Sequence, residues 1–326
     1  MSAPEKKFSA DIPIVFSVND NYAKYLSVCI RSIQRYRNSE QRYHIFIMHR
    51  DISEEHQSMI LEMADAGTQI SFINVSGQLD SSILYISGTI TEETYYRVLI
   101  PELLPELDKV VYLDCDLVCT ENIAGLYEAA DFSSGDMWFA GTLASRNELR
   151  DSYTREHLGV PSDTYINAGV MVINCAALRE NHFLEQAVAF LKEKQYLKWH
   201  DQDLVNALGY SHILLLDRRW HATLGTIANE LGVPVNDLKL NDLNYAIVHF
   251  ASRKPWRSEL LEPMTLFWQY VPESPFVSDI IREYRCISDT KRRYEDLCSS
   301  NQVSLKEIVI CLNRALSSRF RNLKNR

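Results

Sequence analysis

The sequence lacks any apolar run long enough to cross a membrane as a helix. Its longest apolar runs, such as 12–18 and 109–113, have the length of a β-strand, whereas a membrane-spanning helix needs about 20 apolar residues. The opening segment MSAPEKKFSAD also lacks the basic region, the apolar stretch and the small-residue cleavage site of a secretory signal. We therefore expect a soluble protein of the cytoplasm.

Features that stabilise small secreted or zinc-binding domains are also missing. The seven cysteines form no CxxC pair and no repeated spacing, so they indicate neither a disulfide framework nor a zinc knuckle. No internal repeat or low-complexity segment is present. With 326 residues, of which 46% are hydrophobic, the chain can bury one large core, or one core and a smaller appendage.

Charge is distributed unevenly along the chain. The formal net charge is -9, yet residues 282–326 contain 11 basic and 5 acidic residues. From residue 308 to the end there are five basic residues and no acidic ones, among apolar side chains at Ile308, Ile310, Leu312, Leu316, Phe320 and Leu323. Such a segment fits an anionic membrane surface, where each basic residue contributes about 1 kcal/mol. It equally fits a solvated C-terminal helix. The first alternative places the protein peripherally on the inner face of the cell membrane.

The first 250 residues alternate between strand-like and helix-like patterns, which predicts an α/β fold with a mostly parallel sheet flanked by helices. Buried strands are predicted at 12–18, 44–49, 69–75, 109–116, 138–144, 168–174 and 213–216, and helices at 22–36 and from 53 onward. Past residue 260, the segment EPMTLFWQYVPESP carries three prolines and is followed by helical patterns without strands. We therefore predict an α/β domain at 1–272 and a basic helical region at 273–326.

Two carboxylates end a predicted strand in VVYLDCDLVC. Asp114 and Asp116 are two residues apart, so both side chains of an extended chain point to the same side. The ends of parallel strands are where open α/β sheets bind ligands. Carboxylates at this spacing can share a divalent cation whose remaining ligands are water and phosphate oxygens. Taken alone, the DxD tripeptide equally fits aspartates that end a strand and begin a turn.

Five further blocks join polar groups to apolar segments in a definite order around this tripeptide. They are NDNYAKYLSVCIRSI from residue 19, TYYRVLIPELLP from 94, INAGVMVIN from 166, HDQDLVNAL from 200 and IVHFASRKPW from 247. Together they resemble the retaining glycosyltransferases of family eight, which include galactosyl- and glucosyltransferases of bacterial lipopolysaccharide synthesis, and glycogenin. The resemblance covers about residues 12–260 and implies a GT-A-like, nucleotide-binding catalytic domain.

The resemblance implies a metal site. It assigns Mn²⁺, with Mg²⁺ as the alternative, to Asp114, Asp116 and His249, the histidine just before the KPW segment. An imidazole beside carboxylates and diphosphate oxygens suits Mn²⁺ better than Ca²⁺. Departure of UDP leaves negative charge on the β-phosphate, which the cation and the ammonium of Lys254 stabilise. Without the resemblance, His249 is a structural histidine and Lys254 a solvated lysine.

The resemblance also implies where a UDP-sugar donor binds. The residues implied to contact the donor are Ser17, Asn19, Asn21, Tyr22, Arg97, Asp114, Cys115, Asn167 and Lys254. Asn19 stands where the family commonly has an aspartate that accepts the uracil N–H, and an asparagine keeps an acceptor oxygen. Taken alone, NDN is an ordinary turn sequence.

The HDQD block supplies the implied catalytic residues, together with Lys254. Asp201 and Gln202 match positions that hold the transferred sugar, with Gln202 near the anomeric carbon on the face opposite the UDP. Because an amide is a poor nucleophile, we expect front-side attack in which the UDP phosphate takes the acceptor proton. Asp203 is the alternative candidate for a nucleophile. Without the resemblance, DQDL is a helix start with acidic residues in its first turn.

Two segments depart from the family pattern. HFASRKPW is one residue shorter than the usual HxxGxxKPW and has Ser252 or Arg253 in place of a glycine, so the loop over the phosphates is expected to follow a different path. GTLASR at 141–146 has Ser145 near the usual place of an aspartate. The choice between glucose and galactose, and the acceptor, therefore stay open.

Other classes of protein remain as alternatives. LDCDLV also fits a haloacid-dehalogenase-type phosphatase, although the downstream lysine and paired acidic motif of that class are not apparent. A nucleotidyltransferase would carry a glycine-rich phosphate loop near the start, which NDNYAK is not. A non-enzymatic UDP-sugar-binding partner protein is suggested by the unusual loop at 250–254.

The expected partners follow from the family resemblance and from the basic tail. They are a UDP-sugar donor, a glycan acceptor such as a lipid-linked lipopolysaccharide core, and the membrane surface. We expect no nucleic acid partner.

Overall fold

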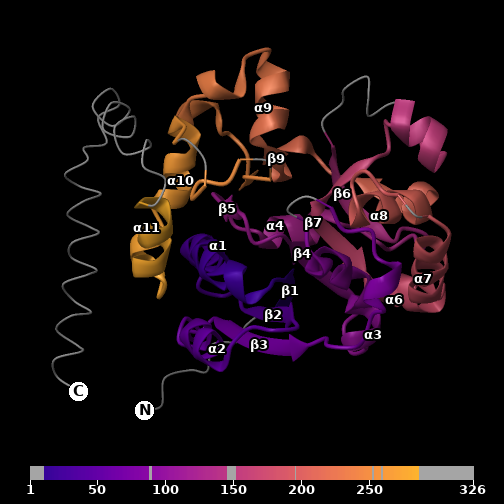
Figure 1. Cartoon of the computed structure of the whole chain (residues 1–326), viewed down its shortest axis with the longest axis horizontal. Coiled ribbons are helices and arrows are strands. Elements are labelled where there is room, and N and C mark those ends of the chain that lie inside the picture. Colours follow the sequence, from indigo (N-terminus) through magenta and orange to yellow (C-terminus); the bar gives the residue numbers. More distant parts are fainter. Residues whose placement is uncertain are drawn as a thin grey trace.

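The computed structural model describes residues 11–87, 90–144, 152–194, 196–251, 253–257 and 260–285. Among these residues, a seven-stranded sheet in the order β3-β2-β1-β4-β7-β6-β8 forms the centre of the fold (Figure 1). Its strands are β1 (Ile12–Ser17), β2 (Tyr43–His49), β3 (Thr68–Asn74), β4 (Lys109–Leu113), β6 (Phe139–Leu143), β7 (Ile166–Asn174) and β8 (Ile213–Leu215). No helix in the described ranges is long and apolar enough to span a bilayer.

The direction of β7 decides which residues meet at the edge of this sheet. β1 is parallel to β2 and β4, β2 to β3, and β6 to β8, whereas β7 is antiparallel to both β4 and β6. The predicted mostly parallel sheet is thus confirmed. Because β7 is reversed, its N-terminal end lies beside the C-terminal end of β4, and the backbone N–H of Asp114 donates to the carbonyl of Gly169 at 2.8 Å.

Alternate side chains of the central strands enter two different hydrophobic cores. Ile14 and Phe16 of β1 belong to a core that includes Leu26 from the helix after β1, whereas Val15 belongs to a second core with Leu204. Strands that are covered on both faces are apolar along their whole length, which is typical of parallel sheets. This burial explains the continuous hydrophobic run at 12–18.

Helices cover both faces of the sheet (Figure 1). The first core is covered by α1 (Ala23–Tyr36), α2 (Glu54–Leu61), α4 (Ala124–Ala129), α9 (Leu224–Leu231), α10 (Thr265–Trp268) and α11 (Val277–Arg285), and the second by α3 (Ile100–Leu103), α6 (Cys175–Glu180), α7 (Phe183–Glu193) and α8 (Asp201–Gly209). The predicted helices at 22–36 and from 53 are confirmed. The side chain of Ser53 caps α2 by accepting the backbone N–H of His56.

A second sheet of three short strands adjoins the end of β4. It has the order β5-β10-β9 and consists of β5 (Leu117–Cys119), β9 (Ala222–Thr223) and β10 (Ile247–His249). β10 runs antiparallel to β5, with His249 opposite Leu117. The strands β5 and β9 escaped prediction because two or three residues are too few to show a period. This sheet places His249 beside the DxD tripeptide.

Residues just past the predicted domain boundary at 272 pack on the first core. Phe276, Val277 and Ile280 are buried in it, and the phenol of Tyr25 in α1 donates a hydrogen bond to Glu283 in α11. A truncation that removes α11 would therefore expose apolar surface. The basic segment at 308–326, with its predicted membrane contact, lies outside the described residues, and the boundary itself stays a prediction.

Candidate active site

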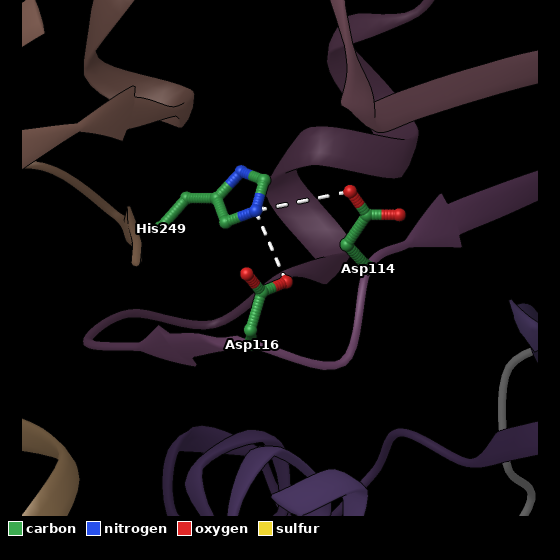
Figure 2. A group of neighbouring side chains, drawn as sticks. All are labelled: Asp114, Asp116 and His249. Carbon is green, nitrogen blue, oxygen red and sulfur yellow. Dashed lines mark hydrogen bonds and ion pairs between the residues drawn. The ribbon is translucent and has the colours of Figure 1, made fainter. Parts of the chain in front are cut away.

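Asp114, Asp116 and His249 meet at the carboxyl end of β4 (Figure 2). Each offers one ligand atom, and these atoms lie within 4.8 Å of one another. His249 Nε2 is 3.1 Å from Asp116 Oδ1 and 3.7 Å from Asp114 Oδ2. Two carboxylates and one imidazole that converge in this way form a suitable set of ligands for a divalent transition-metal ion.

The cluster is positioned by the backbone of both sheets. Asp114 and Asp116 lie in the bend between β4 and β5, so the DxD follows the strand instead of ending it. The backbone N–H of Phe250, next to His249, donates to the carbonyl of Asp116 at 2.9 Å. The carboxylates and the imidazole are therefore held together by hydrogen bonds on either side of the cluster.

Gly169 leaves room for these side chains. A Cβ atom at this position would lie 2.5 Å from His249 Cε1 and 2.6 Å from Asp114 Oδ2. Both distances are shorter than real Cβ contacts, so any side chain would displace two of the three ligand groups. The close approach explains the glycine of the INAG motif, and the space it leaves fits a metal ion.

A buried hydrogen-bond chain orients His249. Its Nδ1 atom lies 3.1 Å from His221 Nε2, and His221 Nδ1 lies 3.2 Å from Thr142 Oγ1. Burial holds the pKa of His221 well below its ordinary value, so this imidazole is neutral and can accept the Nδ1–H of His249. When a metal ion binds, the Nε2 atom of His249 would present its lone pair to that ion.

Lys254 completes the charged part of the site. Its ammonium group donates to Asp116 Oδ2. Burial acts to raise the pKa of Asp116, but Lys254 and His249 outweigh it and hold that pKa well below the usual range. Burial similarly acts to lower the pKa of Lys254, but Asp116 outweighs it, so the pKa of Lys254 is raised. Both groups are therefore charged at neutral pH.

Arg97 connects the metal cluster to α8. It lies in the 3-10 helix η3 (Glu92–Leu99) and is 4% exposed. Its Nη2 is 3.1 Å from Asp114 Oδ1 and its Nε is 2.9 Å from Asp201 Oδ2. The guanidinium also lies over the ring of Tyr112, 4.2 Å from the ring centroid. The predicted donor-contacting arginine thus binds the two carboxylates that flank the site.

These groups line one cavity of about 490 Å³, within the usual size range of small-molecule sites. Of the predicted site residues, it is lined by Ser17, Asn19, Tyr22, Arg97, Asp114, Cys115, Asp116, Asn167, Asp201, Gln202, His249 and Lys254. Asn21 and Asp203 are not among the lining residues. The structure therefore brings together most of the predicted set and leaves these two outside it.

Asp201 and Gln202 are held rigidly at the start of α8. Asp201 accepts from Thr94 Oγ1 at 2.5 Å and pairs with Arg97. Burial raises the pKa of Asp201 to about 6 despite this arginine. Gln202 Oε1 accepts the backbone N–H of Ala168 at 3.1 Å, so its amide is fixed at the wall of the cavity.

Asp203 serves the structure of the loop before α8. It is completely buried and accepts from Tyr165 Oη at 2.5 Å, Tyr153 Oη at 2.9 Å and the backbone N–H of Trp199 at 2.8 Å. A carboxylate surrounded by three donors is poorly placed to attack carbon. The structure gives no support to Asp203 as the alternative nucleophile.

The sequence patterns did not predict several residues of this site. Glu93 and Thr94 line the cavity from η3, and Thr223 at the end of β9 and Thr226 at the start of α9 also line it. EETYYR carried a signal for the first two, because it places them three and four residues before the predicted Arg97. The threonines and His221 had no such signal, since they lie in segments without a recognisable pattern.

A mixed sheet of this topology, flanked by helices, is the GT-A fold of solved glycosyltransferases. The galactosyltransferase LgtC, solved with donor and acceptor sugar analogs, matches with a TM-score of 0.66 at 24% identity over 79% of this chain and 95% of that chain. The bifunctional glycosyltransferase WbbM matches with a TM-score of 0.70 at 23% identity over 85% of this chain and 52% of that chain. At these identities, the likeness shows the fold.

The chain belongs to glycosyl transferase family 8, whose sequence profile matches residues 13–259. General stress protein A of Bacillus subtilis (strain 168) is 27% identical over 77% of this chain and 89% of its own length. A lipopolysaccharide 1,2-glucosyltransferase of Escherichia coli (strain K12) is 27% identical over 62% of this chain and 61% of its own length. The family resemblance is confirmed, and the chain spans less than two thirds of the second relative.

Proposed function

We propose that this chain transfers glucose or galactose from a UDP-sugar to a glycan acceptor, with retention of the anomeric configuration and with Mn²⁺ as the cofactor. The observation that carries the proposal is one cavity in which the metal-binding cluster and Lys254 lie together with Asn167 and Gln202. A glycosyltransferase needs a sugar donor and a glycan acceptor, and this cavity combines cationic and amide groups that suit a nucleotide sugar.

The residues present fit a divalent cation. Asp114, Asp116 and His249 supply three ligand atoms, and Gly169 leaves the necessary space. When bound there, Mn²⁺ would stabilise the negative charge that develops on the β-phosphate as UDP leaves. Lys254 supplies a second positive charge beside the same groups, because its ammonium already lies at Asp116 on the cavity wall.

Other residues that line the cavity are suited to the transferred sugar. Asn167 Oδ1 accepts the backbone N–H of Gly169 at 2.9 Å, which leaves its amide N–H groups to donate to sugar hydroxyls. Asp201 is fixed by Arg97 and can accept from a hydroxyl group. Groups that are already held in place need little reordering when the sugar binds.

Retention is best explained by attack on the same face that UDP leaves. In that step the bond between the anomeric carbon and the β-phosphate oxygen breaks, and its electron pair stays with UDP. The acceptor oxygen forms the new bond, and its proton passes to a phosphate oxygen of UDP. Gln202, whose amide is fixed by Ala168, supports the positive charge on the sugar ring with its dipole. Asp201 and Lys254 are the other proposed catalytic residues.

The acceptor is proposed to be a lipopolysaccharide or another cell-surface glycan. Support comes from relatives of this chain, which include a lipopolysaccharide 1,2-glucosyltransferase of Escherichia coli and a lipopolysaccharide 1,3-galactosyltransferase of Salmonella typhimurium (strain LT2). Such an acceptor is lipid-linked, which agrees with the proposed contact of the basic tail with the inner face of the cell membrane. The proposed location is therefore cytoplasmic and peripheral to that membrane.

Release of UDP tests this proposal. Purified full-length chain, Mn²⁺ and a panel of UDP-sugars should release UDP with UDP-glucose or UDP-galactose, and addition of cell-envelope glycans should raise the rate. Asp116→Asn should abolish release, whereas Asp237→Asn, at an exposed carboxylate, should leave it unchanged. Binding of UDP-sugar without turnover, even with authentic acceptors, would favour the non-enzymatic alternative. The family membership leaves the phosphatase alternative without support.

A further inference from the structure

Glu93 is a buried carboxylate on the cavity wall that the proposed reaction does not use. It is 4% exposed, lies in η3 and lines the cavity. Its only hydrogen bond within the described part of the chain comes from Asn19 Nδ2, at 3.4 Å to Oε2. No cation lies within ion-pair distance of it there, and Arg50, which interacts with it electrostatically, forms its ion pair with Glu92. Burying a carboxylate with so few donors is unfavourable, so a donor supplied by a ligand would stabilise it.

The neighbouring carboxylate, Glu92, differs from Glu93 in its number of hydrogen-bond partners. Glu92 accepts from Tyr96 Oη at 2.6 Å and Ser81 Oγ at 2.8 Å, and it pairs with Arg50. Its oxygens are therefore satisfied by the protein itself. Glu93, one residue further along η3, faces the cavity and keeps unused acceptor capacity.

The side-chain oxygen of Asn19 is already engaged within the protein, so it is not available to accept a hydrogen bond from a ligand. Its Oδ1 accepts the backbone N–H of Tyr22 at 3.2 Å, as the cap of the short helix η1 (Asp20–Tyr22). The amide is oriented by this bond, so Nδ2 points to Glu93. Side by side at the cavity wall, Asn19 therefore presents an amide donor and Glu93 a carboxylate acceptor.

An aromatic ring lies close to this pair in the sequence and in the cavity. Tyr22 lines the cavity, and its backbone N–H donates to Asn19 Oδ1 at 3.2 Å. A flat heterocycle can pack against such a ring while its phosphates reach Lys254 and the metal cluster. Asn167 and Asp201 line the same cavity and supply amide and carboxylate groups that suit sugar hydroxyls.

We propose that Glu93 and Asn19 together select the base of the donor nucleotide. The Glu93 carboxylate accepts the ring N–H of uracil, and the Asn19 amide donates to the carbonyl beside it. A pyrimidine such as cytosine, whose ring nitrogen carries no hydrogen at that place, leaves the carboxylate facing a lone pair. This inference rests on the proposed UDP-sugar donor and assigns its base selectivity to two side chains.

Calorimetric binding of UDP, CDP and GDP to the full chain with Mn²⁺ tests it. The wild type should prefer UDP, and Glu93→Ala should weaken UDP binding by about 10- to 100-fold, with a much smaller loss for CDP. Glu93→Gln, which is isosteric and retains an acceptor oxygen, should lose less affinity for UDP. Glu102→Gln, at an exposed carboxylate of α3, is the matched control and should bind like the wild type.

A double variant separates base recognition from a purely structural role. Asn19→Asp alone puts a second carboxylate beside Glu93, so like-charge repulsion should weaken UDP binding. Asn19→Asp combined with Glu93→Ala leaves one carboxylate and should bind UDP more tightly than either single variant. A structural role predicts no such rescue and equal losses for all three nucleotides.

The outcomes distinguish this inference from the proposed function. If the wild type binds none of the three nucleotides in the presence of Mn²⁺, the proposed function fails. If it prefers UDP and the Glu93 variants keep that preference unchanged, the function stands and the assignment of Glu93 is overturned. Equal binding of UDP and CDP by the wild type also overturns the assignment.

Discussion

Replacing His221 by asparagine should weaken the binding of Mn²⁺ by about 10- to 100-fold. His249 is 3% exposed, and its Nδ1 lies 3.1 Å from His221 Nε2. An asparagine is too short to reach the place of this Nε2 atom, so the buried Nδ1–H of His249 loses its partner, at about 1–3 kcal/mol. The ring of His249 is then free to turn its Nε2 away from Asp114 and Asp116.

Titration with Mn²⁺, followed by the electron paramagnetic resonance signal of the free ion, measures this effect with and without UDP. His221→Gln is expected to recover most of the affinity, since its amide oxygen extends to the place of the lost Nε2. His182→Asn, at an exposed histidine, is the matched control. Urea unfolding reports any loss of fold stability separately. The reasoning is refuted if the Asn and Gln variants bind Mn²⁺ equally well.

Three further predictions concern catalysis, pH and the tail. Lys254→Ala should lower kcat for UDP release by about 10²- to 10³-fold, because the departing phosphate loses its ammonium partner. Burial raises the pKa of Asp201 to about 6, so turnover should fall as the pH decreases through 6 and the carboxylate is protonated; Asp201→Asn should lack this acidic limb. Truncation after residue 285 should spare UDP release and weaken binding to anionic vesicles, and unchanged vesicle binding would contradict the role of the tail.

The same raised pKa of Asp201 affects stability, with a definite sign. A carboxyl group that is harder to ionise in the folded state favours folding when protonated. Its contribution is fully present below the ordinary pKa of 3.8 and is lost as the pH rises through about 6. In thermal unfolding, Asp201→Asn should therefore lose less stability than the wild type as the pH rises from 3.8 to about 6.

Much of the fold was predictable because its strands are covered on both faces. The run around Ile14 and Phe16 is apolar throughout, which marks a buried strand without knowledge of its neighbours. The metal cluster was predictable only through the order of the sequence blocks. Nothing in the spacing between Asp116 and His249 indicates that they meet, since the contact depends on pairing between β5 and β10.

Other features of the site depend on geometry that a linear pattern does not contain. The antiparallel direction of β7, which brings Gly169 to Asp114, leaves no mark in a strand that is apolar on both faces. His221 lies far from His249 in sequence and has no motif of its own. Asp203 follows Asp201 by two residues, which is about 200° around a helix, so it faces the interior while Asp201 faces the cavity.

The central claim is that one divalent cation bound by Asp114, Asp116 and His249 also binds the diphosphate of the donor. Anomalous diffraction at the manganese edge, from crystals grown with Mn²⁺ and UDP, tests it most directly. We predict a single strong peak within bonding distance of these three side chains and of the UDP phosphates. Ordered UDP in the cavity, with no manganese peak among the three side chains, would contradict the account.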